Sequence, residues 1–207
     1  MVIDYFFLKN KWNIKSKKII HVGAHHGQEL SFYLNDPDIE EIVFFEPSLD
    51  NYNQLTKNIE LANSNNIKKI TAHPVGLGAE ENIVDFHVAS NGQSSSVLKP
   101  QLHTSQYRDI LFNKVEKIQI KTLDSFNLND FEFISIDVQG YELEVLKGAK
   151  NTLNNIKYIY TEINNAPLYE NCVMIDQLDS FLSEFNFKRE DTNWCGGTWG
   201  DAIYIKR

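Results

Sequence analysis

The stretch IIHVGAHHG, residues Ile19–Gly27, carries a run of apolar residues that ends between two glycines. The run predicts a buried strand, and the glycines at its end allow a sharp turn into a helix. Bare backbone at Gly23 and Gly27, beside a helix N-terminus, lets ligand atoms approach closely. The stretch is therefore a candidate nucleotide loop, although any tight strand-to-helix turn can use two glycines for structure alone.

A carboxylate follows at the spacing that nucleotide recognition uses. The predicted strand 41–46 ends in Glu46, which Pro47 follows, and lies about 20 residues after the loop, where Glu or Asp accepts hydrogen bonds from both ribose hydroxyls. A pyrophosphate also needs a middle glycine for backbone approach, and residues 24–26 contain none. S-adenosylmethionine therefore fits this loop better than a nicotinamide dinucleotide.

The rest of the chain alternates short β-branched or aromatic runs with amphipathic stretches. This alternation predicts an α/β, Rossmann-like fold, with a mostly parallel sheet and helices on both faces. The segments 67–75 and 83–89 are expected to pair as an edge hairpin across a turn-prone segment that contains Gly76. The predicted strands are 18–22, 41–46, 67–75, 83–89, 115–121, 133–137 and 158–163, and the predicted helices are 27–35, 50–62, 141–147 and 175–185.

Two features lie outside this alternation. Residues 187–190 and 202–206 predict a C-terminal antiparallel hairpin around the turn 191–201, an arrangement that resembles methyltransferase topology more than dehydrogenase topology. Residues 90–113 lose regular periodicity, which predicts a long surface loop and a substrate lid.

Length and charge limit the possible functions. The chain has 207 residues, 42% of them hydrophobic, which suits one domain over 1–207 with an N-terminal extension at 1–17. A net charge of -8 opposes binding to phosphate backbones, so no nucleic-acid partner is expected. No apolar run approaches the roughly 20 residues of a membrane span, so no membrane partner is expected. Cys172 and Cys195 are too few for a disulfide framework, which favours a reduced, cytoplasmic protein of open oligomeric state.

Four stretches of the chain resemble the FkbM-type methyltransferases. They are VGAHHG at 22–27, FEP at 45–47, KTLDSF at 121–126 with IDVQGYELEVLKGA at 136–149, and GDAIY at 200–204. The resemblance runs from Ile19 to Arg207, and its third stretch is the most specific. It implies a class I methyltransferase fold, S-adenosylmethionine as the donor and S-adenosylhomocysteine as the product. It also implies O-methylation of a hydroxyl on a sugar, glycan or glycosylated small molecule.

The loop and the resemblance together indicate a set of donor-site residues. The family usually has Asp at the place of His21 and Asn at the place of His25. A neutral histidine at position 21 supplies no negative charge for the methionine amino group, which favours weaker donor binding. The expected cofactor-binding residues are His21, Gly23, Ala24, His25, Gly27, Glu46, Pro47, Gly76 and Asp137.

Three residues are catalytic candidates. Asp137 ends a central strand, where it can accept a hydroxyl proton or hold the cofactor ammonium group. Glu162 ends the next strand and is its partner; with Asn164 it could bind a hard divalent cation, although no metal is expected. His103, in the predicted lid, is the third candidate proton acceptor.

Two other functions remain open from the sequence. A nicotinamide-dependent oxidoreductase would use a similar fold and carboxylate. A catalytically silent nucleotide-binding module is suggested by His21 and His25, which depart from the family pattern.

Overall fold

The computed structural model describes residues 4–65 and 67–207 and confirms the Rossmann-like prediction. Seven strands form the main sheet: β1 (Lys18–Val22), β2 (Glu41–Phe45), β3 (Lys69–His73), β7 (Phe133–Ile136), β8 (Tyr158–Asn164), β9 (Phe187–Cys195) and β10 (Trp199–Lys206). Their order is β3-β2-β1-β7-β8-β10-β9. All pairs from β3 to β8 are parallel, and β10 runs antiparallel to both of its neighbours.

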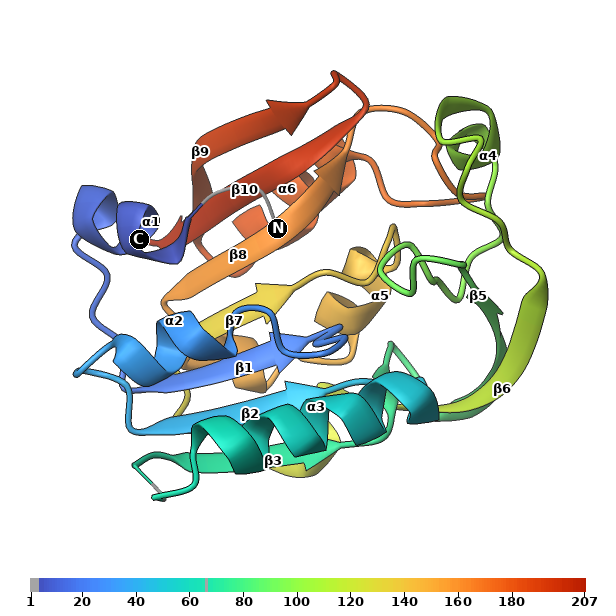
Figure 1. Ribbon diagram of the computed structural model, residues 1–207. Coiled ribbons are helices and arrows are strands. Elements are labelled where there is room, and N and C mark those ends of the chain that lie inside the picture. Colours follow the sequence, from blue (N-terminus) through green and yellow to red (C-terminus); the bar gives the residue numbers. More distant parts are fainter. Residues whose placement is uncertain (1–3, 66) are drawn as a thin grey trace.

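Helices cover both faces of this sheet (Figure 1). Successive side chains of a strand point to opposite faces, so Ile19 packs in one core cluster and Ile20 in the other. The cluster with Ile19 contains residues of α1, α2 and α3, and the cluster with Ile20 contains residues of α5 and α6. The helices are α1 (Tyr5–Trp12), α2 (Leu30–Asn35), α3 (Leu49–Ala62), α4 (Leu102–Gln106), α5 (Glu142–Lys147) and α6 (Ile175–Ser183), with short 3₁₀ turns at Leu123–Phe126 and Thr152–Asn154.

The expected edge hairpin between 67–75 and 83–89 is wrong. β3 instead pairs in parallel with β2, and β5 (Asn82–Val88) joins a separate three-stranded sheet with β4 (Gly76–Leu77) and β6 (Lys114–Lys121). Phe86 of β5 packs there against Ile118 and Ile120 of β6, in a small core of its own. Burial of these side chains outweighs the short chain separation that favoured the hairpin.

The C-terminal antiparallel pair is confirmed, but its strands are longer than expected. Most of the predicted turn 191–201 is strand, and the chain reverses at Gly196 and Gly197, whose φ angles are +64° and +79°. Across the other edge of β10, Asp201 lies opposite Glu162 of β8. The hairpin therefore brings a second carboxyl group to the end of the parallel sheet.

Segment 90–113 is more ordered than a surface loop. It contains α4, and both Ser96 and His103 within it are fully buried. The backbone N–H groups of Gln101 and His103 donate to the carbonyl oxygen of Leu168. The segment thus packs against the chain that follows β8.

The predicted N-terminal extension also contributes to the core. Tyr5 and Leu8 of α1 are buried, and the Tyr5 hydroxyl donates to Asp36 at 2.8 Å. Of the helices within 4–65 and 67–207, none is long and apolar enough to cross a bilayer.

Candidate functional site

Two adjoining cavities lie at the carboxyl ends of β1, β2 and β7. The wide cavity has a volume of about 420 Å³, and the narrow cavity has a volume of about 50 Å³. Gly23, His25, Gln93 and Asp137 line both of them, so the cavities meet above the loop that follows β1. Open α/β sheets place their ligands at this edge.

The loop after β1 depends on glycine at its first position. Gly23 has a φ of +80°, and a Cβ there would lie 1.8 Å from the carbonyl oxygen of Asp137. The loop therefore crosses the end of β7 in direct backbone contact. Gly27 serves packing instead, since a Cβ there would lie 2.8 Å from a methyl carbon of Leu55.

Glu46 lies at the narrow cavity and is held by backbone donors on both carboxyl oxygens. The N–H of His25 donates to Oε2 at 2.7 Å, and the N–H of Ser48 donates to Oε1 at 2.9 Å. Burial raises the pKa of Glu46 to about 7, and these two donors oppose the rise. Pro47 and Gly76 also line this cavity.

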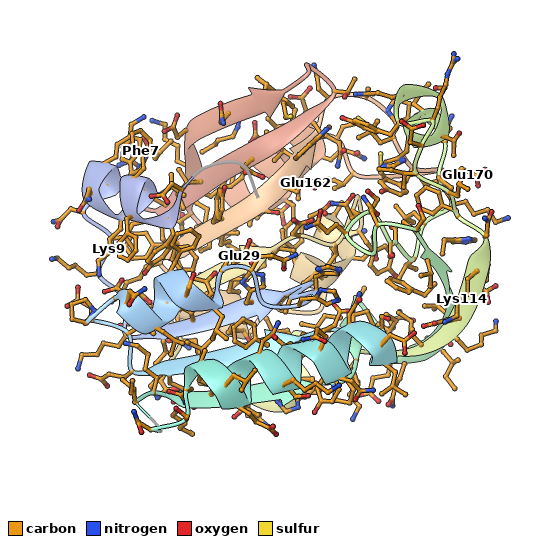
Figure 2. The ribbon with its side chains drawn as sticks, viewed as in Figure 1. Phe7, Lys9, Glu29, Lys114, Glu162 and Glu170 are labelled. Carbon is orange, nitrogen blue, oxygen red and sulfur yellow. The ribbon has the colours of Figure 1, made fainter. Side chains whose placement is uncertain are left out.

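A histidine of β1 lies in the wall of the wide cavity. His21 is fully buried, and its Nδ1 lies 2.9 Å from the Tyr33 hydroxyl. Burial lowers the pKa of His21, so the imidazole is neutral near pH 7. Its Nε2 lies 3.8 Å from a carboxyl oxygen of Glu29, which lines the same cavity and is labelled in Figure 2. The carboxyl group of Glu29 is therefore an acidic neighbour of His21 in this cavity.

Two carboxyl groups at the ends of β7 and β8 share one amide. Nε2 of Gln139 donates to Asp137 Oδ1 at 2.8 Å and to Glu162 Oε2 at 2.6 Å. Burial raises the pKa of Glu162 well above its usual range, and the nearby carboxyl groups of Asp137, Glu142 and Asp201 raise it further. Both effects disfavour the ionised form of Glu162, which is labelled in Figure 2.

Glu142, the first residue of α5, holds the turn at residues 138–140, which follows Asp137. Its Oε1 accepts from the N–H groups of Val138 at 3.2 Å and Gly140 at 3.0 Å. The side chain is fully buried, and burial raises the pKa of Glu142 to about 7. These two hydrogen bonds thus fix the turn that carries Gln139.

The outer wall of the wide cavity is aromatic. The indole N–H of Trp199 donates to the Tyr107 hydroxyl at 2.7 Å, which ties the terminal hairpin to the end of α4. His103 contacts the rings of Tyr107 and Tyr169, and its buried Nδ1 has no hydrogen-bond partner among the described residues. Burial lowers the pKa of His103, which leaves a neutral imidazole at the wall.

Most of the residues expected from the sequence meet at these cavities. The donor-site candidates His21, Gly23, His25, Glu46, Pro47, Gly76 and Asp137 line one or both of them, and Glu162 and His103 line the wide one. Ala24 and Gly27 are not among the lining residues; Ala24 is buried, and Gly27 packs against Leu55.

Sequence reasoning missed several lining residues. Gln139 stood within the most specific stretch, so its position was a usable signal. Glu29 has no local signature, and Tyr107 was expected only as part of the predicted lid 90–113, because packing alone brings these two residues to the wall. Within 4–65 and 67–207 no group of three or more His, Cys, Asp or Glu side chains is arranged to hold a metal ion, and the lining of the wide cavity includes no Lys or Arg.

Comparison with known proteins gives consistent matches. The family described as the methyltransferase FkbM domain matches residues 21–189. The 2-O-methyltransferase NoeI of Sinorhizobium fredii is 26% identical over 201 residues, which cover 89% of this chain and 77% of NoeI.

Solved structures share the fold. Methyltransferase FkbM from Methylobacillus flagellatus has a TM-score of 0.62 at 18% identity, covering 92% of this chain and 44% of that one. This chain therefore spans less than half the length of that protein. Magnesium protoporphyrin IX methyltransferase from Synechocystis, solved with bound S-adenosylmethionine, has a TM-score of 0.56 at 9% identity, covering 98% of this chain and 76% of that one.

Proposed function

This chain belongs to the FkbM methyltransferase family, and we propose that it moves the methyl group of S-adenosylmethionine to a hydroxyl of an uncharged sugar, glycan or glycosylated small molecule. The family assignment confirms the class of enzyme that the four sequence stretches indicated. The observation that carries the proposal is the pair of adjoining cavities. One contains Glu46, the other contains Asp137 and Glu162, and the two meet at Gly23.

We assign the narrow cavity to the adenosine part of the donor. Glu46 lies there with Pro47 and Gly76, and its carboxyl oxygens keep lone pairs for ribose hydroxyls. The narrow cavity is small, and a Cβ on Gly92 would lie 2.6 Å from Nε2 of His25. Segment 90–113 therefore lies very close to His25 in the loop after β1. We expect the segment to move when the donor binds.

The methionine part would lie toward the wide cavity. Glu29 and Asp137 line that region, and their acidic character suits a cationic ammonium and sulfonium. Glu29 would supply the charge that His21 lacks, which argues against a silent binding module. When bound, S-adenosylmethionine supplies an electrophilic methyl group, so the protein contributes mainly alignment and exclusion of water.

Replacement of Glu46 tests the donor assignment. Glu46→Ala should weaken binding of S-adenosylhomocysteine by roughly 10- to 150-fold, because losing a charge-assisted hydrogen bond commonly costs about 1.5 to 3 kcal/mol. Isothermal titration calorimetry measures the change. Glu80→Ala, at an exposed position, is the matched control and should bind like the wild type. Equal affinity for Glu46→Ala and the wild type would remove Glu46 from the donor site.

The acceptor would occupy the outer part of the wide cavity. Tyr107 and Trp199 offer aromatic faces of the kind that pack on the C–H surfaces of sugars, and polar groups from Asn91, Gln93 and Ser94 are available for hydroxyls. The absence of Lys and Arg from the cavity lining disfavours phosphorylated acceptors. NoeI is named as a 2-O-methyltransferase, which supports oxygen as the methyl acceptor.

Asp137 is the first choice for the proton acceptor as the new C–O bond forms and the C–S bond breaks. The raised pKa of Glu162 favours its protonated form, so Glu162 is better suited to hold Asp137 in place than to accept a proton. The neutral imidazole of His103 is the alternative acceptor from the opposite wall.

Replacement of Trp199 tests the acceptor wall. Trp199→Ala should raise the KM for a sugar acceptor roughly two- to tenfold, if stacking on this ring is worth about as much as an aromatic pair, about 0.5 to 1.5 kcal/mol. Affinity for S-adenosylhomocysteine should stay unchanged. Trp194→Ala is the matched control, since Trp194 lies on β9 with 40% of its surface exposed. If both variants keep the wild-type KM, the acceptor does not use this wall.

The whole proposal is tested by donor binding and methyl transfer. We expect S-adenosylhomocysteine to bind in calorimetry and NAD to give no signal. Labelled S-adenosylmethionine should methylate some member of a panel of methyl glycosides of neutral hexoses and deoxyhexoses. Binding of NAD alone would identify an oxidoreductase, and binding of neither ligand would identify a silent module.

A further inference from the structure

We propose that Gln139 is a positioning residue for methyl transfer: its amide clamps the carboxyl groups of Asp137 and Glu162 at the floor of the wide cavity, and Tyr169 sets the orientation of that amide. The expected effect of Gln139 on the rate of methyl transfer rests on the proposed function. The clamp itself follows from the contacts of Gln139.

The hydrogen bonds of the Gln139 amide favour one orientation. Its two N–H donors reach Asp137 at 2.8 Å and Glu162 at 2.6 Å. Its Oε1 accepts from the Tyr169 hydroxyl at 2.9 Å. Rotation of the amide by 180° would turn its oxygen toward the carboxyl oxygens of Asp137 and Glu162 and remove both N–H donors from them. Tyr169 therefore selects the orientation in which the amide holds the pair.

The backbone of Gln139 is also held in an unusual conformation. Its φ is +56°, in the left-handed region that non-glycine residues rarely adopt. The Ser96 hydroxyl donates to its carbonyl oxygen at 2.8 Å, and Glu142 accepts from the N–H groups on either side. Such a conformation is unfavourable by itself and persists where the surroundings over-determine it, commonly at active sites.

An amide suits this position better than a charged side chain would. Two carboxyl groups on neighbouring strand ends repel each other when both are ionised. A lysine would cancel the negative charge that suits a cationic donor, and a glutamate would add to the repulsion. A neutral donor group holds both carboxyl groups and leaves the charge of the site in place.

The clamp also joins the floor of the cavity to segment 90–113. The Tyr169 hydroxyl lies 2.8 Å from the carbonyl oxygen of Ser94 as well as 2.9 Å from Gln139. Ser94 lines the wide cavity, and Ser96 holds the Gln139 backbone. A movement of this segment would therefore shift Gln139, and with it the positions of the Asp137 and Glu162 carboxyl groups.

The test uses Gln139→Asn, which keeps an amide but is one methylene too short to span both carboxyl groups. Asn tolerates positive φ better than Gln, so the variant should melt at or above the wild-type temperature. The turnover number for the best methyl glycoside should fall roughly 10- to 100-fold, the scale of a misplacement of about 1 Å. Gln119→Asn, on the exposed surface of β6, is the matched control and should keep wild-type turnover.

A second readout separates positioning from a structural role. Carbon-13 NMR of the Glu162 carboxyl, assigned with Glu162→Gln, follows its titration. The charged and titratable groups that face Glu162 are Asp137, Glu142, Asp201 and Tyr169. Loss of an N–H donor disfavours the ionised form, so the titration midpoint of Glu162 should move to higher pH in Gln139→Asn. Tyr169→Phe should move it in the same direction by less.

The possible results are distinct. A stable Gln139→Asn protein with wild-type turnover and an unmoved Glu162 titration overturns the clamp. Lower stability of the variant with an unmoved titration reduces Gln139 to a structural residue and also overturns it. If the wild type methylates no acceptor, the proposed function fails, and the Glu162 titration still decides whether Gln139 holds the pair.

Discussion

Asp137→Asn is expected to lower the rate of methyl transfer by roughly 10² to 10⁴, the usual range for general acid–base assistance. The substitution keeps the size of the side chain and can keep one hydrogen bond, but it removes the negative charge beside Gly23. If Asp137 accepts the hydroxyl proton, affinity for S-adenosylhomocysteine should hold while turnover falls. If Asp137 holds the donor ammonium group, affinity should weaken as well.

Single-turnover rates and calorimetry on the same preparation distinguish these two roles. Asp85→Asn is the matched control, because Asp85 forms an exposed ion pair with Lys117 on the three-stranded sheet, away from the cavities. A folded Asp137→Asn protein with wild-type rate and wild-type donor affinity would exclude both roles. Attention would then turn to His103 as the proton acceptor.

Gly23→Ala should destabilise the protein by about 2 to 5 kcal/mol, combining roughly 1 to 2 kcal/mol for a left-handed residue with roughly 1 to 3 kcal/mol for overpacking. The added Cβ would lie 1.8 Å from the carbonyl oxygen of Asp137, so the loop after β1 must leave the end of β7. Donor affinity should fall with stability, because both cavities meet at this contact.

Gly197→Ala provides the comparison that isolates the clash. Gly197 has a φ of +79°, close to that of Gly23, but a Cβ there would meet no atom within 4 Å. Its cost should therefore be only the roughly 1 to 2 kcal/mol of the backbone conformation. Urea unfolding measures both variants. Equal losses of stability would show that contact with β7 does not constrain the donor loop.

Local patterns were enough to predict most of the sheet and the donor loop. The run at Ile19–Gly27 specifies a buried strand and a turn through neighbouring residues, and Glu46 ends the next strand in the same way. Parallel strands end at one edge of a sheet, so these two signals predicted where the cavities would lie. The predicted roles of Asp137, Glu162 and His103 still await the experiments above.

Pairing between distant segments could not be predicted in this way. The hairpin expected for 67–75 and 83–89 relied on closeness in sequence, whereas β3 pairs with β2 and β5 pairs with β6. The aromatic wall similarly depends on the contact between Tyr107 and Trp199, which lie 92 residues apart.

The sequence by itself therefore determined the fold class, the methyltransferase family and the edge of the sheet that binds ligands. Only the tertiary structure decided which side chains meet there. Gln139 reaches Glu162 over 23 residues and Tyr169 over 30 residues of chain. Strand periodicity and glycine turns arise from interactions between near neighbours, whereas these hydrogen bonds form only when the whole sheet has brought the ends of β7 and β8 together.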